Sequence, residues 1–150
     1  EIASCLVGSE MCIRDRSKCG EYQKIIVSRD TGNKREHRAI NSNGKHKVRQ
    51  YKLDGDIVKQ RKCCDFLVLN DSVKKAYYIE LKGENIDEAI PQLESAVQIC
   101  SQELRQYDVF YRIVCSKIRT HKINSNKFRK FQAKVGRKLQ YSSIRMEENI

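Results

Sequence analysis

Two neighbouring apolar segments constrain the fold of this chain more than any other feature. One runs from Cys64 to Leu69 and the other from Ala76 to Gly83, with a short polar stretch between them. Their β-branched and aromatic residues, bounded by Asn, Asp, Ser and Gly, predict two buried β-strands. Buried strands rarely carry charge, because an unpaired charge in an apolar interior is costly. These two nevertheless carry Asp65, Glu80 and Lys82.

The three charged residues could together hold a divalent cation. Glu80 and Lys82 share one face of their strand, with Cα atoms roughly 6.5–7 Å apart. If Asp65 faces Glu80 from the neighbouring strand, the two carboxylates offer the oxygen ligands that Mg²⁺ prefers, with Mn²⁺ as an alternative. Such a cation acidifies a water molecule and polarises a phosphodiester, and Lys82 could stabilise the developing charge. In the simpler alternative, Glu80 and Lys82 form an ion pair at a sheet edge and Asp65 caps a turn.

The remaining pattern predicts one α/β domain. At 150 residues the chain suits a single domain with a real core. From residue 48 onward we expect strand, strand, strand, helix, strand, helix. The expected strands cover 48–58, 64–69, 76–83 and 109–115, the helices cover 86–104 and 124–139, and an edge strand covers 141–146. Before residue 48 the pattern is weaker, with a strand or helix end at 22–27 and one helical turn at 36–40.

The first sixteen residues are interpreted as a non-native leader, and residues 17–150 as the domain. Residues 5–16, Cys-Leu-Val-Gly-Ser-Glu-Met-Cys-Ile-Arg-Asp-Arg, resemble the peptide that results when a sequencing adaptor is translated with a gene. The stretch has neither helical nor strand periodicity, and we assign it no functional role. The expectation is that the authentic N-terminus is truncated; the alternative is an ordinary short terminal helix.

The charge distribution predicts a polyanionic partner. The formal net charge is +11, and no acidic residue lies between Asp108 and Glu147. The basic helix at 124–139 could follow nucleic-acid phosphates, lie on a membrane surface, or be a solvated face. We favour nucleic acid over a membrane. The candidate contacts are Lys117, Arg119, Lys122, Lys127, Arg129, Lys130 and Lys134.

Cysteine and hydropathy patterns indicate a cytoplasmic protein. The seven cysteines show no Cys-x-x-Cys spacing, and we interpret them as reduced, mostly buried residues. No apolar run reaches the roughly 20 residues that span a bilayer. The three histidines, His37, His46 and His121, are isolated in the sequence and are interpreted as surface residues. His121 lies close to Arg119 and Lys122 in the sequence and could also contact a phosphate.

At Asp65 and at Glu80-Leu81-Lys82, separated by fourteen residues, the sequence resembles the PD-(D/E)XK nuclease superfamily, which has the restriction-endonuclease-like fold. The resemblance covers roughly residues 48–116. It implies a core of helix, three strands, helix and strand, and Mg²⁺-dependent cleavage of nucleic acid, DNA in preference to RNA. It further implies the Leu81 carbonyl as a metal ligand and Gln92, on the following helix, as an additional polar residue of the site.

The sequence departs from this family in two places. The family's first helix usually supplies another carboxylate, but only Glu21 and Glu36 are available here and neither lies in a convincing helix. Asp54 and Asp56 are substitute candidates. Cys64 stands where the motif has proline, a replacement that is common among members. If the N-terminus is truncated, the missing helix is accounted for and this chain could be inactive.

Three functions remain open from the sequence. The favoured one is a nuclease, either monomeric or pairing as a homodimer to cut both strands. The second is a non-catalytic nucleic-acid-binding module of the same fold. The third is a subunit whose basic face docks an acidic protein.

Overall fold

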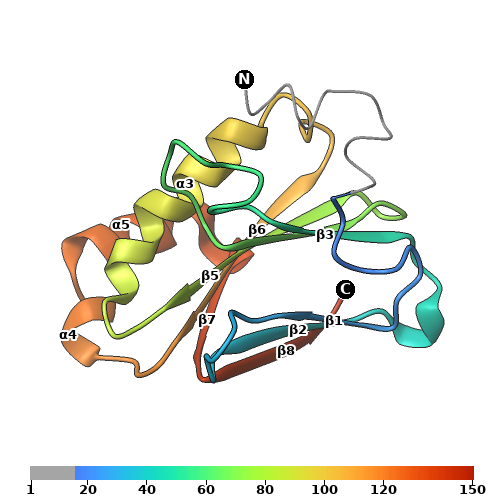
Figure 1. The fold of residues 1–150 in the computed structure, drawn as a ribbon. Helices are drawn as coiled ribbons and strands as arrows, with labels where there is room; N and C mark the ends of the chain where they lie inside the picture. Colours follow the sequence, from blue (N-terminus) through green and yellow to red (C-terminus); the bar gives the residue numbers. More distant parts are fainter. Residues whose placement is uncertain (1–15) are drawn as a thin grey trace.

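The computed structural model describes residues 16–150 and arranges them in three layers (Figure 1). Within that range the strands form one sheet of five strands and one of three. Helices α3 (Ala89–Cys100) and α5 (Asn126–Val135) cover one face of the larger sheet, and the smaller sheet packs against the other. The chain is therefore a single α/β domain, as the sequence predicts.

The five-stranded sheet has the order β3-β4-β5-β6-β7. An antiparallel meander comes first, and two parallel strands, β6 and β7, follow it after helical crossovers. This arrangement confirms the order that the sequence predicts from residue 48. The strands are β3 (Val48–Lys52), β4 (Phe66–Asn70), β5 (Lys75–Lys82), β6 (Asp108–Cys115) and β7 (Leu139–Ser143).

Both faces of the central strands are covered. On the helical face, Leu67 and Tyr78 belong to one apolar cluster with Leu93 of α3 and Phe128 of α5. On the opposite face, residues of β4 and β5 pack against the smaller sheet. A strand that is buried on both faces has little need of polar residues, which explains why β4 and β5 are continuous apolar runs in the sequence.

The three-stranded sheet brings together segments from both ends of the described chain. β1 (Ile25–Ser28) and β2 (Glu36–Ile40) form a hairpin, and β8 (Arg145–Asn149) pairs in parallel with β2. A single residue, Ile144, with φ of +66°, links β7 to β8. Its N–H donates to the Cys115 carbonyl (2.8 Å), and its own carbonyl accepts from the N–H of Glu36 (2.9 Å). Ile144 therefore joins the two sheets at the carboxyl end of β6.

A buried polar cluster also connects the sheets. Glu148 of β8 accepts two hydrogen bonds from Arg112 of β6, at 2.7 and 2.9 Å, and its Oε2 lies 2.6 Å from His37 Nε2 on β2. The Arg112 guanidinium also stacks 5.5 Å from the ring centres of Tyr77 and Phe110. The interpretation of His37 as a surface residue is therefore wrong, because its side chain is fully buried.

Several predicted boundaries differ from those observed. Residues 36–40 are strand β2 rather than a helical turn, and residues 54–58 form a turn closed by an Asp54–Val58 bridge after β3 has ended. The predicted 141–146 strand is replaced by β7 and β8, which belong to different sheets. In the part of the chain before β3 that is described, 16–47, the helical segment is the short 3₁₀ turn η1 (Ser42–Gly44).

Both predicted helices are shorter in the structure, because the outer residues of each predicted range form turns. The 86–104 helix comprises a 3₁₀ turn, η2 (Ile86–Glu88), followed by α3. The 124–139 helix is reduced to α5, where Ser125 Oγ accepts from the Phe128 N–H and Gly136, with φ of +58°, ends the helix. A 3₁₀ turn, η3 (Gly136–Lys138), follows α5 directly, and a short helix, α4 (Thr120–Ile123), precedes it. Among the described helices none is long and apolar enough to cross a bilayer.

Candidate active site

The β4–β5 hairpin places Asp65 opposite Glu80. The antiparallel register pairs Phe66 with Ile79, so the preceding residue of one strand faces the following residue of the other. The Asp65 N–H donates to Glu80 Oε1 (3.2 Å), and the Leu81 N–H donates to Asp65 Oδ2 (2.8 Å). Each carboxylate thus accepts a hydrogen bond from a backbone N–H of the facing segment.

Lys82 and Gln92 complete the group. The Lys82 ammonium lies 3.8 Å from Glu80 Oε2 and donates to Gln92 Oε1 (2.6 Å). The amide nitrogen of Gln92 in turn donates to the Cys63 carbonyl (3.4 Å), which anchors α3 to the segment before β4. The structure therefore brings together Asp65, Glu80, Lys82 and Gln92, the four side chains that the sequence predicts to share a site.

Burial dominates the electrostatics of the two acids. Glu80 is only 2% exposed. Burial, reinforced by the adjacent Asp65, raises the pKa of Glu80 well above its usual range, against the opposing effect of Lys82. Burial also raises the pKa of Asp65, which hydrogen bonds from the Leu81 N–H and from Glu80 partly offset. Without a further cation the pair therefore retains a proton near neutral pH.

The donor set suits a hard divalent cation. Asp65 Oδ1 and Glu80 Oε2 accept no hydrogen bond from the described backbone, so one oxygen of each acid remains available. Because the N–H and C=O of a strand residue point to the same side, the Leu81 carbonyl is directed toward the strand that follows Asp65. Two carboxylates and a carbonyl, completed by water, match the few protein ligands that Mg²⁺ takes. Within residues 16–150 no group of three or more His, Cys, Asp or Glu side chains is placed to hold a metal ion.

The structure does not bring the expected first-helix carboxylate to this site. Glu21 pairs with Lys47 (2.9 Å), and Glu36 lies 3.5 Å from both Arg38 and Arg145. Neither residue lies in a helix. Both candidates are therefore engaged elsewhere in the described part of the molecule.

Of the substitute acids, Asp54 is the better placed. Asp56 pairs with Lys18 (3.3 Å). Asp54, by contrast, lies near enough to Asp65 to contribute to the rise in the pKa of Asp65. It has no ion-pair partner among the residues described.

Two residues near the site were missed by sequence reasoning. Asp30, in the loop between β1 and β2, contributes more than Asp54 does to the raised pKa of Asp65. Lys52, at the end of β3, pairs with Asp30 (2.9 Å) and also interacts electrostatically with Asp65. Lys52 comes near Asp65 through the β3–β4 register, which pairs Lys52 with Phe66, and no pattern in the sequence indicates that register.

The predicted nucleic-acid contacts divide into two groups. Three cations are paired with acids, namely Arg119 with Glu84 (2.5 Å), Lys122 with Asp87 (3.6 Å) and Lys134 with Glu94 (3.2 Å). Four are exposed and form no ion pair with a described carboxylate: Lys117, Lys127, Arg129 and Lys130. His121, another candidate for phosphate contact, is also exposed.

The cations that are paired with acids hold the basic segment, residues 117–134, beside the candidate site. Glu84 and Asp87 lie two and five residues after Lys82 in the chain, so their pairs with Arg119 and Lys122 hold the α4 region next to the carboxyl end of β5. Ligands of α/β proteins commonly bind at the carboxyl ends of parallel strands. The basic segment and the two acids therefore share that edge of the sheet.

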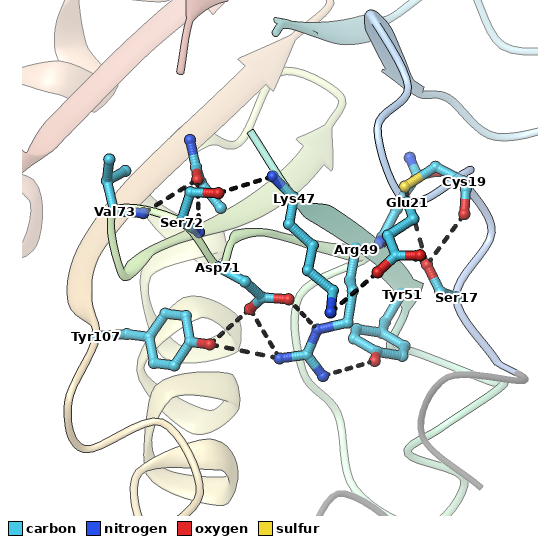
Figure 2. A network of polar contacts seen from close by, with 12 residues as sticks. Ser17, Cys19, Glu21, Lys47, Arg49, Tyr51, Asp71, Ser72, Val73 and Tyr107 are labelled. Carbon is cyan, nitrogen blue, oxygen red and sulfur yellow. Dashed lines mark hydrogen bonds and ion pairs between the residues drawn. The ribbon is translucent and has the colours of Figure 1, made fainter. Parts of the chain in front are cut away.

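A second polar cluster lies at the opposite end of the β4–β5 hairpin (Figure 2). Asp71 accepts two hydrogen bonds from Arg49, at 2.7 and 2.9 Å, and one from the Tyr107 hydroxyl at 2.5 Å. Burial would raise the pKa of Asp71, but these hydrogen bonds outweigh it and lower that pKa. Figure 2 also shows Lys47 reaching Glu21 in an ion pair.

The cluster lines a cavity of about 560 Å³. None of the four predicted site residues lies there. Because its main charged side chains neutralise one another, we interpret it as a contact that holds the β4–β5 turn to the segment after α3.

No protein-family model matches the chain, and no curated protein or solved structure matches it either.

Proposed function

We propose that this protein hydrolyses phosphodiester bonds in nucleic acid, DNA in preference to RNA, with the help of Mg²⁺ or Mn²⁺. The observation that carries the proposal is the convergence of Asp65, Glu80, Lys82 and Gln92 at one end of the β4–β5 hairpin. This is the group of residues on which the sequence resembles the PD-(D/E)XK nucleases.

Each residue has a role that its geometry supports. Asp65 and Glu80 would hold the cation with the oxygens that the backbone leaves available. The cation, when bound, would polarise the phosphodiester and acidify a water molecule. Lys82 would stabilise the negative charge that develops on the phosphate. Gln92 fixes the direction of the Lys82 ammonium through its 2.6 Å hydrogen bond.

The surroundings supply a surface for a polyanion. Lys117 lies just beyond the carboxyl end of β6, and Lys127, Arg129 and Lys130 lie exposed on α5. Cations without acidic partners can neutralise phosphates and release counterions. The proposal includes a cytoplasmic setting, where the described cysteines, all free thiols and four of them buried, would stay reduced.

A second candidate is a nucleic-acid-binding module that has lost catalysis. It is favoured by the engagement of Glu21 and Glu36 away from the site, which leaves two carboxylates where the resembling family usually has three. This alternative predicts salt-sensitive binding that does not depend on a divalent cation.

Cleavage of plasmid and of single-stranded DNA, with Mg²⁺, with Mn²⁺ and with EDTA, tests the proposal. We expect Glu80→Gln and Lys82→Met each to lower the cleavage rate by about a hundredfold or more. Glu80→Gln resembles the protonated acid in shape, so the fold should be retained. Glu147→Gln is the matched control, because it removes an exposed carboxylate on β8.

Cleavage activity that persists in both site variants would show that these residues do not catalyse the reaction. Binding without cleavage, unchanged by EDTA, would favour the non-catalytic module. Failure to bind DNA or RNA even at low salt would reject both candidates.

A further inference from the structure

An arginine outside the candidate site, Arg35, lies at the same edge of the larger sheet. Arg35 directly precedes β2, and the neighbouring residue Glu36 is hydrogen-bonded through its N–H to Ile144, whose own N–H reaches the Cys115 carbonyl. These backbone contacts place Arg35 at the carboxyl end of β6. Its Nη1 donates to Ser116 Oγ at 2.6 Å.

The same guanidinium lies against the carboxyl end of β5. A Cβ atom on Gly83 would lie 3.9 Å from Arg35 Nη1. The Ser116 N–H donates to the carbonyls of Lys82 (3.1 Å) and Gly83 (2.9 Å), so the hydroxyl that holds Arg35 is itself fixed to the strand that carries Lys82. Arg35 thus lies at the carboxyl ends of β5 and β6, which is the edge of the larger sheet at which Lys82 also lies.

The charge of Arg35 is not compensated within the described chain. Its Nε is buried and has no hydrogen-bond partner, and no described carboxylate forms an ion pair with it. The acids nearest to this region in sequence, Glu36 and Glu84, are paired with other arginines. Leaving a buried charged donor without a partner is costly. Ser116 is the hydrogen-bond partner that the structure gives to this guanidinium, and guanidinium groups with unused donors are favoured partners of phosphate.

We infer that Arg35 and Ser116 form a phosphate-binding site for the backbone of the nucleic-acid substrate, next to the phosphate that is cleaved. The inference rests on the proposed function and extends it, because it assigns a substrate contact to the three-stranded sheet. Gly83 leaves the end of β5 without a side chain, so that the strand of nucleic acid can approach the guanidinium. The exposed Lys117 follows Ser116 directly and adds a second cation to the same edge.

Binding of a short fluorescein-labelled DNA duplex, and of the same sequence as a single strand, tests this inference. Fluorescence anisotropy is measured with EDTA at several salt concentrations, so that binding is read without cleavage. Arg35→Met keeps the length of the side chain but removes the charge and donors, and we expect about tenfold weaker binding. The slope of log affinity against log salt for the duplex should become shallower by about 1.

Further variants separate a substrate contact from a structural role. Arg35→Lys keeps the charge but lacks the planar set of N–H donors, so it should recover only part of the affinity that Arg35→Met loses. Ser116→Ala keeps the arginine but removes its support, and should weaken binding less than Arg35→Met. Arg105→Met is the matched control, since Arg105 is exposed beyond the opposite, amino-terminal end of β6. Thermal unfolding of each variant verifies the fold.

The outcomes are distinguishable. In one outcome, the wild-type protein binds and cleaves DNA, and Arg35→Met, Arg35→Lys and Ser116→Ala all bind DNA as tightly as the Arg105→Met control does. The phosphate-binding site is then rejected and the proposed function stands. If the wild-type protein neither binds nor cleaves, both are rejected. If the Arg35 variants bind DNA more weakly than the control and keep the wild-type midpoint of thermal unfolding, the phosphate-binding site is supported.

Discussion

At the scale of single residues, Glu148 is the carboxylate whose pKa the surrounding hydrogen bonds lower most clearly, and it is not part of the candidate site. Its carboxylate is 14% exposed and contacts Arg112 and His37, which are 4% and 0% exposed. Burial alone would raise the pKa of Glu148, but the hydrogen bonds from His37 and Arg112 outweigh that effect and lower it to about 2. The ionised form of Glu148 is therefore part of what holds the two sheets together.

This shift makes the stability of the protein depend on pH. A group whose pKa is lower in the folded state stabilises the protein above its unfolded pKa, here 4.5, and loses that contribution as the pH falls toward about 2. The difference corresponds to about 3 kcal/mol. We expect the free energy of unfolding to fall through this window in the wild-type protein, and much less steeply in Glu148→Gln.

Urea unfolding at a series of pH values measures the effect. Glu148→Gln should also be less stable at neutral pH, because Arg112 loses its buried partner. Glu147→Gln, on the adjacent and exposed position of the same strand, should keep the wild-type pH profile. A wild-type profile in Glu148→Gln would show that another group is responsible.

The residues of the candidate site could be predicted because their relation is local. Glu80 and Lys82 share a face through the alternation of a strand, and Asp65 lies one hairpin away. Lys52 and Arg35 could not be found in this way. Their positions depend on the β3–β4 register and on the pairing of β2 with β8, and neither leaves a periodic signal in the sequence.

At the scale of elements, the connection between β7 and β8 carries backbone strain. Ile144 adopts φ of +66°, a conformation that a β-branched residue rarely takes. Its side chain is 54% exposed, so little apolar burial compensates for the strain. The position is held by the two backbone hydrogen bonds that join the sheets.

Relieving that strain should stabilise the protein. Asn and Gly tolerate the left-handed region, so we expect Ile144→Asn and Ile144→Gly to raise the free energy of unfolding by about 1 kcal/mol. Denaturant titration compares them with Ile25→Asn, which replaces an isoleucine of similar exposure, 44%, in regular strand geometry. That control should be neutral or destabilising. A loss of stability in both Ile144 variants would show that the side chain contributes more than its backbone strain costs.

The same connection explains why the 141–146 prediction was wrong. The residues on either side of Ile144 read as one strand, because no Gly or Pro interrupts residues 141–146. The change of sheet at Ile144 depends on contacts with Glu36 and Cys115, which are distant in sequence. Helix ends were misjudged for a different reason, because Gly136 ends α5 within an apolar pattern that continues to Leu139.

At the scale of the whole molecule, the positive charge is concentrated. The net charge is +11, and Lys127, Arg129 and Lys130 of α5 are exposed and form no ion pair with a described carboxylate. If nucleic acid binds there, replacing Lys127, Arg129 and Lys130 together by Gln should weaken binding to all DNA sequences alike. The slope of log affinity against log salt should then decrease by up to about 3.

The control for this experiment removes the same charge elsewhere. Gln at Lys24, Lys45 and Arg105, all exposed and outside α5, lowers the net charge equally. If both triple variants weaken DNA binding to the same extent, the overall charge matters and α5 is not a specific contact. Binding lost only in the α5 variant would locate the contact on that helix.

The parallel pairing of β2 with β8 has a consequence for how the protein is made. During translation, Glu36–Ile40 leaves the ribosome long before Arg145–Asn149, its hydrogen-bonded neighbour. The smaller sheet is incomplete until the later segment has been synthesised, and the part of the apolar cluster to which Met146 of β8 belongs stays uncovered until then. The nascent chain therefore depends on its last strand to cover a surface that would otherwise be open to chaperones and to aggregation.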